Sequence, residues 1–372
     1  MNTQATNRTL PTTHDRYPEN GPLGWASIIL CAAALAFGLL WLLIPAAGPF
    51  AAGNTPLEQL LGIGQGASIA AAALLAAAGA LTLTTGLLPA TRPDWLGRTL
   101  PPLAAVAAAL VALCLIGFDG IVIAGYTLAL SLPLGLLALI LLLARRRPWL
   151  ALAVSLPALG VLVLALTGHF PLGVLYVKFA TTVLDEPVRY ATALGLIIFA
   201  GLGMVRGVSA SAVAFGGLGA SVQRHRVTLT VLAALCPLPY VLARISWLTP
   251  WPLFGGDAQK FADDPSMFAT GLMLGAAMLL GALLTIGLVR PWGTRFPHWV
   301  PGIGGQPVPT RLAVIPALTV AVLFTAGGAQ ELVLIAAGQL HWASALMLPF
   351  WAWGPLLALA TWGYARYRAA EG

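Results

Sequence analysis

Five polar side chains that could carry chemistry stand near the ends of long apolar stretches in this sequence. They are Asp119, His169, Arg244, Glu331 and His341. A charge in or beside a membrane-spanning segment is costly, and it usually faces a protein interior or a water-filled cavity. The carboxylates and histidines could act as acid–base groups, and Arg244 could pair with Glu331. We therefore treat the five residues as a candidate polar site at the outer mouth of a membrane domain.

Three of these residues also have simpler interpretations. Arg244 could extend its guanidinium group to the lipid headgroups. Glu331 follows Gly327-Gly328 and could lie in a loop, or in a helix that the two glycines unwind. Asp119 could be a turn residue, because Phe118-Asp119-Gly120 has the composition of a tight hairpin. The sequence leaves both interpretations open for each residue.

A further acidic pair, Asp185 and Glu186, lies before another apolar stretch. Pro187 follows the pair, and Arg189 can neutralise it. Acidic residues are favoured at a helix N-terminus. We interpret the pair as the solvated start of a helix rather than as a reactive group.

Most sites with a recognisable sequence pattern are missing from this chain. The histidines lie far apart and no HExxH occurs, so we expect no metal site. The patterns GxSxG and GxxxxGK[ST] are missing too, and the basic residues form no stripe that would suit nucleic acid. We expect no cofactor, no nucleic-acid partner and no identifiable catalytic residue. The cysteines lie inside apolar stretches and are interpreted as small buried side chains: Cys31, Cys114 and Cys236.

The elements that must position the polar residues are membrane-spanning helices. Hydrophobic residues make up 59% of the 372 positions and charged residues 8%, whereas soluble domains carry about 25% charged residues. Crossing the hydrocarbon core takes about 20 apolar residues, and continuous apolar runs predict helices rather than barrel strands. We predict an all-α polytopic transmembrane helix bundle with ten spans: 24–46, 64–88, 101–118, 121–143, 150–167, 188–206, 228–248, 267–289, 312–334 and 342–364.

The distribution of basic residues predicts the orientation of this bundle in the bilayer. With both termini in the cytoplasm, fifteen basic residues lie on the inside and four on the outside, which agrees with the positive-inside rule. Eight of the twelve acidic residues then lie outside. We expect a multi-pass protein of the cell membrane. The division at 118–120 matters most, because one long helix there would move every later loop to the other side.

The chain divides into a disordered cytoplasmic tail (1–23), a transmembrane domain (24–365) and a short cytoplasmic tail (366–372). The first and last four spans share short patterns. Gly79-Ala80-Leu81 recurs as Gly281-Ala282-Leu283. This pattern suggests a 4+2+4 parallel repeat of a kind found in transporters. Chance matching in a chain rich in Ala, Leu and Gly is the alternative.

The cytoplasmic loop 290–311 contains five prolines and four glycines, which exclude a long helix. It is either a docking loop for a partner protein or a connector at the membrane surface. With its RPWG…FP…W…P run and a chain of seventeen Arg against two Lys, the sequence resembles uncharacterised polytopic membrane proteins of GC-rich actinobacteria. The resemblance covers this one loop and implies a membrane protein, with no activity attached.

Three functions fit these observations. The first is a transporter or permease-like protein for a small or amphipathic solute. The second is a non-catalytic membrane subunit or scaffold, whose cytoplasmic loops bind a partner. The third is a membrane enzyme acting on a lipid-linked substrate, for which the sequence shows no catalytic pattern.

Overall fold

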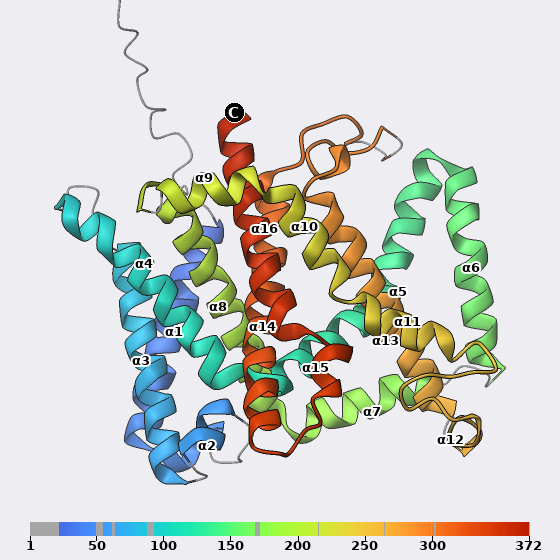
Figure 1. The fold of residues 1–372 in the computed structure, drawn as a ribbon, viewed down its shortest axis with the longest axis horizontal. Coiled ribbons are helices and arrows are strands. Elements are labelled where there is room, and N and C mark those ends of the chain that lie inside the picture. The colour runs from blue at the N-terminus through green and yellow to red at the C-terminus, as the bar shows by residue number, and fades with distance from the viewer. Residues whose placement is uncertain are drawn as a thin grey trace, which may run out of the picture.

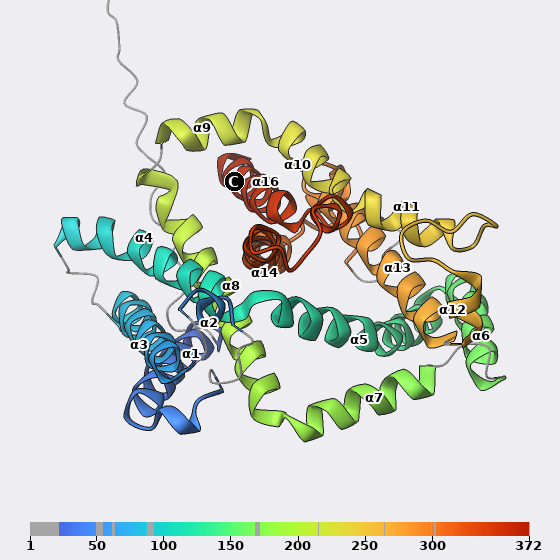
Figure 2. The ribbon, with the colours of Figure 1, turned by 60° about the horizontal axis from the view of Figure 1, so that its bottom comes forward.

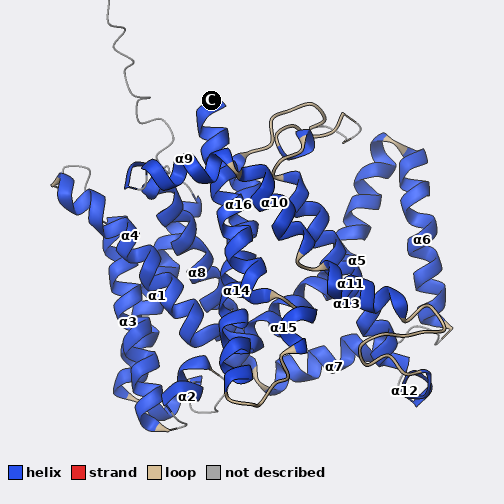
Figure 3. Cartoon of the chain, viewed as in Figure 1, coloured by secondary structure: helices blue, strands red, loops and turns tan. Residues whose placement is uncertain are grey.

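The protein is a helical bundle. The computed structural model describes residues 22–49, 55–61, 64–87, 93–167, 172–214, 216–263, 265–298, 300 and 303–371, so residues 1–21 of the predicted tail 1–23 lie outside the described residues. These residues form helices and no strand, apart from an isolated bridge between Arg295 and Pro307 (Figure 3). The α-helices are α1 (Pro22–Leu43), α2 (Pro56–Leu61), α3 (Gln65–Leu87), α4 (Asp94–Val111), α5 (Gly117–Arg146), α6 (Pro148–Leu166), α7 (Leu172–Asp185), α8 (Pro187–Ala214), α9 (Gly216–Arg224), α10 (Arg226–Leu235), α11 (Leu238–Ser246), α12 (Ala258–Asp263), α13 (Pro265–Gly287), α14 (Thr310–Ala336), α15 (Ala343–Met347) and α16 (Phe350–Glu371). Short 3-10 turns lie at η1 (Pro45–Ala47) and η4 (Pro291–Gly293), and η3 (Ala112–Ile116) is a π-helical segment.

Among the described residues, eight helical stretches are long and apolar enough to cross a bilayer. The chain is therefore a polytopic integral membrane protein, as predicted. Two shorter apolar helices, Pro133–Arg145 and Pro148–Gly160, overlap the predicted spans 121–143 and 150–167. The count of ten spans and the internal repeat stay predictions. The eight stretches are Trp25–Leu43, Gln65–Leu87, Thr99–Thr127, Pro187–Val205, Arg226–Ser246, Met267–Gly287, Thr310–Ala336 and Ala343–Glu371.

Helix α14 is the central element of the bundle. It packs against α16, α8, α5, η3 and α15. Leu323 and Ala326 belong to a hydrophobic core shared with α1, α3, α4 and α8, whereas Leu318 and Ala321 belong to a second core shared with α10 and α16. The two cores therefore meet on α14, and packing on both sides holds this helix in place.

The predicted tight hairpin at 118–120 is wrong, because these residues are helical. The break lies earlier, at Gly117, where φ is +55° and ψ is −159°. Residues other than glycine rarely adopt this backbone conformation, so glycine suits the junction. In Figure 1, α4 runs from the upper left to the lower centre, and α5 then rises to the upper right. The chain thus changes direction at Gly117 within a continuous helical stretch, and the sides on which the later loops lie stay a prediction.

The arginine-bearing segments gather on one side of the molecule. The start of α4, the α5–α6 junction, α9, the loop after α13 and the end of α16 all lie at the top of Figure 1. We call this side the arginine face. On the opposite face lie α2, α7, α12 and the loop between α14 and α15. Helix α7 runs across the long axes of α14 and α16, and Figure 2 shows it extending beneath α5.

The loop after α13 is folded and attached to α16. Main-chain hydrogen bonds join Phe296 to Gln306 and Val308 to Thr294, at 2.9 Å each. The Arg368 guanidinium donates to the carbonyls of Thr294 and Val308, at 3.3 Å and 3.1 Å. The described part of this loop is therefore an ordered structure on the arginine face.

Candidate functional site

Gln330 of α14 ties together two other elements on the opposite-face side of the bundle. Its Oε1 accepts the main-chain N–H of Phe118 at 2.5 Å, and its Nε2 donates to Oε1 of Gln59 at 2.9 Å. The first bond satisfies an N–H in the first turn of α5, which has no partner within its own helix. Gln330 is 4% exposed. It thus holds the start of α5 and the short helix α2 to the central helix.

Gly327 and Gly328 lie about one helical turn before Gln330. They allow the neighbouring helices to approach α14 closely on both sides. A Cβ at Gly327 would collide with Ile121 of α5, and a Cβ at Gly328 would collide with the main chain of Phe350 and Trp351 in α16. Both glycines are helical, so they do not unwind α14 as the sequence had allowed. They bring two helix breaks, at Gly117 and before Phe350, to the same part of the central helix.

Glu331 directly follows Gln330 on α14. It is helical and buried, with 1% of its surface exposed. The alternative that it lies in a loop is therefore wrong. Its Oε2 is buried without a hydrogen-bond partner. Helix α15 packs against α14 and brings the Ser344 side chain next to this carboxyl group. Ser344 in turn donates its hydroxyl proton to the main-chain carbonyl of His341 at 2.8 Å.

His341 lies at the surface on the opposite-face side, just before α15. Its Nδ1 accepts the main-chain N–H of Ala343 at 3.2 Å. Two residues of the predicted site, Glu331 and His341, are thus connected through Ser344. We call Glu331, Ser344 and His341 the Glu331 site.

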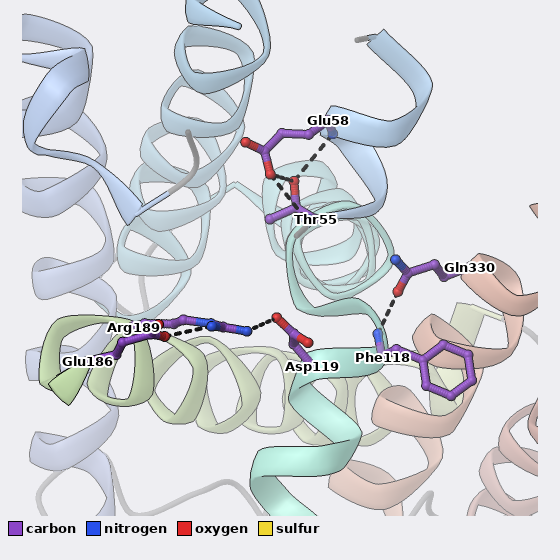
Figure 4. Close-up of polar contacts among 7 residues, drawn as sticks. All are labelled: Thr55, Glu58, Phe118, Asp119, Glu186, Arg189 and Gln330. Atoms are coloured by element: carbon purple, nitrogen blue, oxygen red, sulfur yellow. Dashed lines mark hydrogen bonds and ion pairs between the residues drawn. The ribbon is translucent and has the colours of Figure 1, made fainter. Parts of the chain in front are cut away.

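Asp119 belongs to a different, more exposed cluster. It lies in the first turn of α5 and forms an ion pair with Arg189 of α8, which also contacts Glu186 at 2.6 Å (Figure 4). The expectation that Arg189 neutralises an acid at this helix start is confirmed for Glu186. The side chains of Arg189 and Asp119 are each 38% exposed, so water screens this pair.

Glu58 is a second fully buried acid, and it is satisfied locally. Its Oε2 accepts the main-chain N–H and the hydroxyl of Thr55, at 3.0 Å and 2.9 Å, while the Thr55 hydroxyl accepts the N–H of Glu58 at 3.3 Å (Figure 4). This reciprocal arrangement is a capping box at the N-terminus of α2. It fixes the short helix that presents Gln59 to Gln330.

Arg244 lies apart from Glu331, and no ion pair joins the two residues. Its Cζ lies over the rings of Tyr240 and Trp247, at 4.5 Å and 4.0 Å from their centroids. The favourable interaction is therefore with aromatic faces. His169 lies outside the described residues, so the structure does not place it.

Four residues of these polar contacts were not recognisable as a site from the sequence: Gln330, Gln59, Glu58 and Ser344. A threonine three residues before Glu58 was a usable signal, because Thr-x-x-Glu is the pattern of a capping box. The two glutamines carry no charge and form a pair 271 positions apart. Only the fold shows that they meet.

These features define a polytopic helical membrane protein with a buried polar site on its central helix. In the described part of the chain, no group of three or more His, Cys, Asp or Glu could hold a metal ion. No family model, curated protein or solved structure matches this chain.

Proposed function

We propose that this protein is a permease-like transporter of the cell membrane for a small or amphipathic solute, with the arginine face in the cytoplasm. The observation that supports this proposal most strongly is the convergence of two interrupted helices on residues 327–331 of α14. The chain breaks at Gly117 before α5, and again at Leu348 before α16. Transporters place substrate and ion sites at interrupted helices of this kind, where main-chain groups and buried polar side chains are available.

The surroundings of these breaks support a closed barrier on the cytoplasmic side of the site. Phe324, Phe350 and Trp353 pack together, with ring centroids 4.7 Å and 4.4 Å from Phe324. Helix α14 descends from the arginine face and α16 returns to it (Figure 1). The aromatic cluster therefore lies on the arginine-face side of Glu331 and closes the path toward the cytoplasm. Transport requires this closure to open.

Cysteine accessibility tests the proposal without knowledge of the solute. In a background with the native cysteines replaced by alanine, Ser344→Cys is treated with a charged, membrane-impermeant methanethiosulfonate in right-side-out and inverted vesicles. A transporter exposes its central site alternately to both sides, so we expect labelling in both preparations. Labelling from one side only, or from neither, would contradict transport.

Two exposed positions serve as matched controls and test the orientation. Ala220→Cys on α9 should be labelled only in inverted vesicles, and Asp257→Cys only in right-side-out vesicles. The opposite pattern for both controls would reverse the orientation. It would leave the result for Ser344→Cys interpretable.

A partner subunit is the second candidate, and the folded loop on the arginine face favours it. Arg368 and Tyr364 attach this loop to α16, and the Trp292 side chain is 40% exposed. A photo-crosslinking residue at Trp292 in native membranes distinguishes the alternatives. A docking loop gives a discrete protein adduct, whereas a membrane-surface connector gives lipid adducts.

Among the described residues, no specific contact favours the third candidate, an enzyme that acts on a lipid-linked substrate. Ser344 donates to the main chain of His341 and not to its ring. The two ion pairs that the described residues form both involve Arg189, and neither joins a carboxylate to a histidine.

A further inference from the structure

The two fully buried acids of the described chain differ in how their charge is compensated. Glu58 receives two hydrogen bonds from Thr55. Glu331 keeps one carboxyl oxygen without a partner, at 1% exposure. An ionised carboxylate that is buried without compensation is very costly, whereas a protonated carboxyl group is neutral. The surroundings of Glu331 thus favour the neutral form.

Among the described residues, no ion pair joins Glu331 to a cation on the neighbouring helices. Arg244 of α11 lies on two aromatic rings, and Arg189 of α8 is paired with Asp119 and Glu186. The other charged or titratable groups on the elements around α14 are Glu58 on α2, Asp119, Tyr126, Arg145 and Arg146 on α5, Cys114 on η3, Tyr190 and Arg206 on α8, Tyr240 on α11, His341 before α15, Tyr364, Arg366, Tyr367, Arg368 and Glu371 on α16, and Arg311 on α14 itself.

The Ser344 hydroxyl group is placed where it can respond to the charge of Glu331. Its single proton is donated to the His341 carbonyl, so toward Glu331 the oxygen presents lone pairs. A hydrogen bond between the two side chains in this arrangement requires Glu331 to be the donor, and therefore protonated. When Glu331 loses its proton, the Ser344 hydroxyl is free to rotate toward the carboxylate and leave the His341 carbonyl.

We infer that Glu331 is a proton-binding site, loaded from the outer aqueous phase and linked through Ser344 to the first turn of α15. One proton from water joins a carboxylate oxygen of Glu331, and the same proton leaves when the site is deprotonated. Intramembrane carboxyl groups with these surroundings commonly serve proton pathways. The coupling of this proton to a solute rests on the proposed function, but the binding of the proton does not.

The position of the site supports loading from the outer side. Ser344 is half-buried and His341 is exposed, so the polar path from Glu331 leads toward the opposite face. On the other side, Phe324, Phe350 and Trp353 form an apolar barrier. A second consequence follows, since the hydroxyl of Ser344 cannot donate to Glu331 and to His341 at once. The charge of Glu331 therefore sets the hydrogen bonding that holds the start of α15.

Infrared difference spectroscopy of the purified full-length protein in lipid nanodiscs tests the inference. Buffer is exchanged between about pH 5 and about pH 9, because exposed acids are ionised over most of this range and contribute little. We expect the carbonyl stretch of a protonated carboxylic acid to disappear at the higher pH in the wild type. If this carbonyl band is missing from the wild-type difference spectrum, the inference is overturned. This outcome needs only the wild-type protein and does not depend on the folding of a variant.

Variants assign the band to its residue. Glu331→Gln should remove the band, whereas the matched control Glu58→Gln and the exposed control Asp119→Asn should keep it. Ser344→Ala should keep the band at a shifted frequency, because the protonated carboxyl group loses its acceptor. A band that survives in Glu331→Gln assigns the proton elsewhere and refutes the inference.

The result of the infrared experiment is independent of the result of the cysteine-accessibility experiment. A band assigned to Glu331 together with one-sided labelling of Ser344→Cys would establish the proton site and reject transport. Two-sided labelling without the band would support transport and reject the proton site.

Discussion

Replacing Gln330 with methionine should destabilise the protein by an amount that the structure allows us to work out. Methionine fills a similar volume, so the change removes two hydrogen bonds and little packing. The Phe118 N–H loses its acceptor in a partly buried position, and an unsatisfied buried donor costs about 1–3 kcal/mol. Gln59 is exposed and its Oε1 can bind water. We therefore expect a total loss of about 1–3 kcal/mol, nearly all of it from Phe118.

A double-mutant cycle separates the two bonds. Gln59→Met alone should cost about 1 kcal/mol or less, since its lost bond is replaced by solvent. The double variant should be no less stable than Gln330→Met, because Gln59 has no remaining partner to lose. The measurement is equilibrium unfolding in mixed micelles with sodium dodecyl sulfate, followed by far-ultraviolet circular dichroism. If Gln330→Met has no effect, Gln330 does not support the start of α5; if the two changes add fully, Gln330 and Gln59 are not coupled.

Three further predictions concern the surrounding structure. Gly117→Ala should lower the unfolding free energy by about 1–3 kcal/mol because of its backbone conformation; a neutral result would mean that this junction is relaxed. Asp119→Asn and Arg189→Gln should each cost less than about 1 kcal/mol, since exposed pairs are screened, and the same unfolding assay would expose a larger role. Arg368→Met should speed chymotrypsin cleavage within the loop after α13, whereas Arg295→Met should not; equal rates would show that Arg368 does not hold the loop.

The helical class of the fold could be predicted from composition, because lipid requires a chain to satisfy its main-chain groups internally. The helix α14 was predicted at 312–334 and is observed at Thr310–Ala336. The junction at Gly117 could not be predicted. Its backbone conformation depends on Pro56 and Gln330, which pack where a Cβ would otherwise stand. A sequence pattern for a turn cannot show such a contact.

The candidate site could be predicted only in part. Glu331 and His341 were recognisable because a charged or titratable group is conspicuous beside an apolar stretch. Ser344 was not, since serine is common in such segments and its role depends on the position of α15. The partner of Asp119 lies 70 positions away, and the pairing of Arg244 with Glu331 that the sequence allowed is not among the ion pairs of the described residues. Long-range pairing of side chains is set by packing, which a single sequence does not display.

The two glycines on α14 have a mechanical consequence for the bundle. On one side Gly327 meets α5, and on the other side Gly328 meets the main chain of α16. Contacts between helices are normally spaced by the side chains of both partners. At this level the main chain of α14 sets the spacing itself, because neither glycine carries a Cβ. A substitution at Gly328 would push the main chain of α16 outward, whereas one at Gly327 would have to displace the Ile121 side chain.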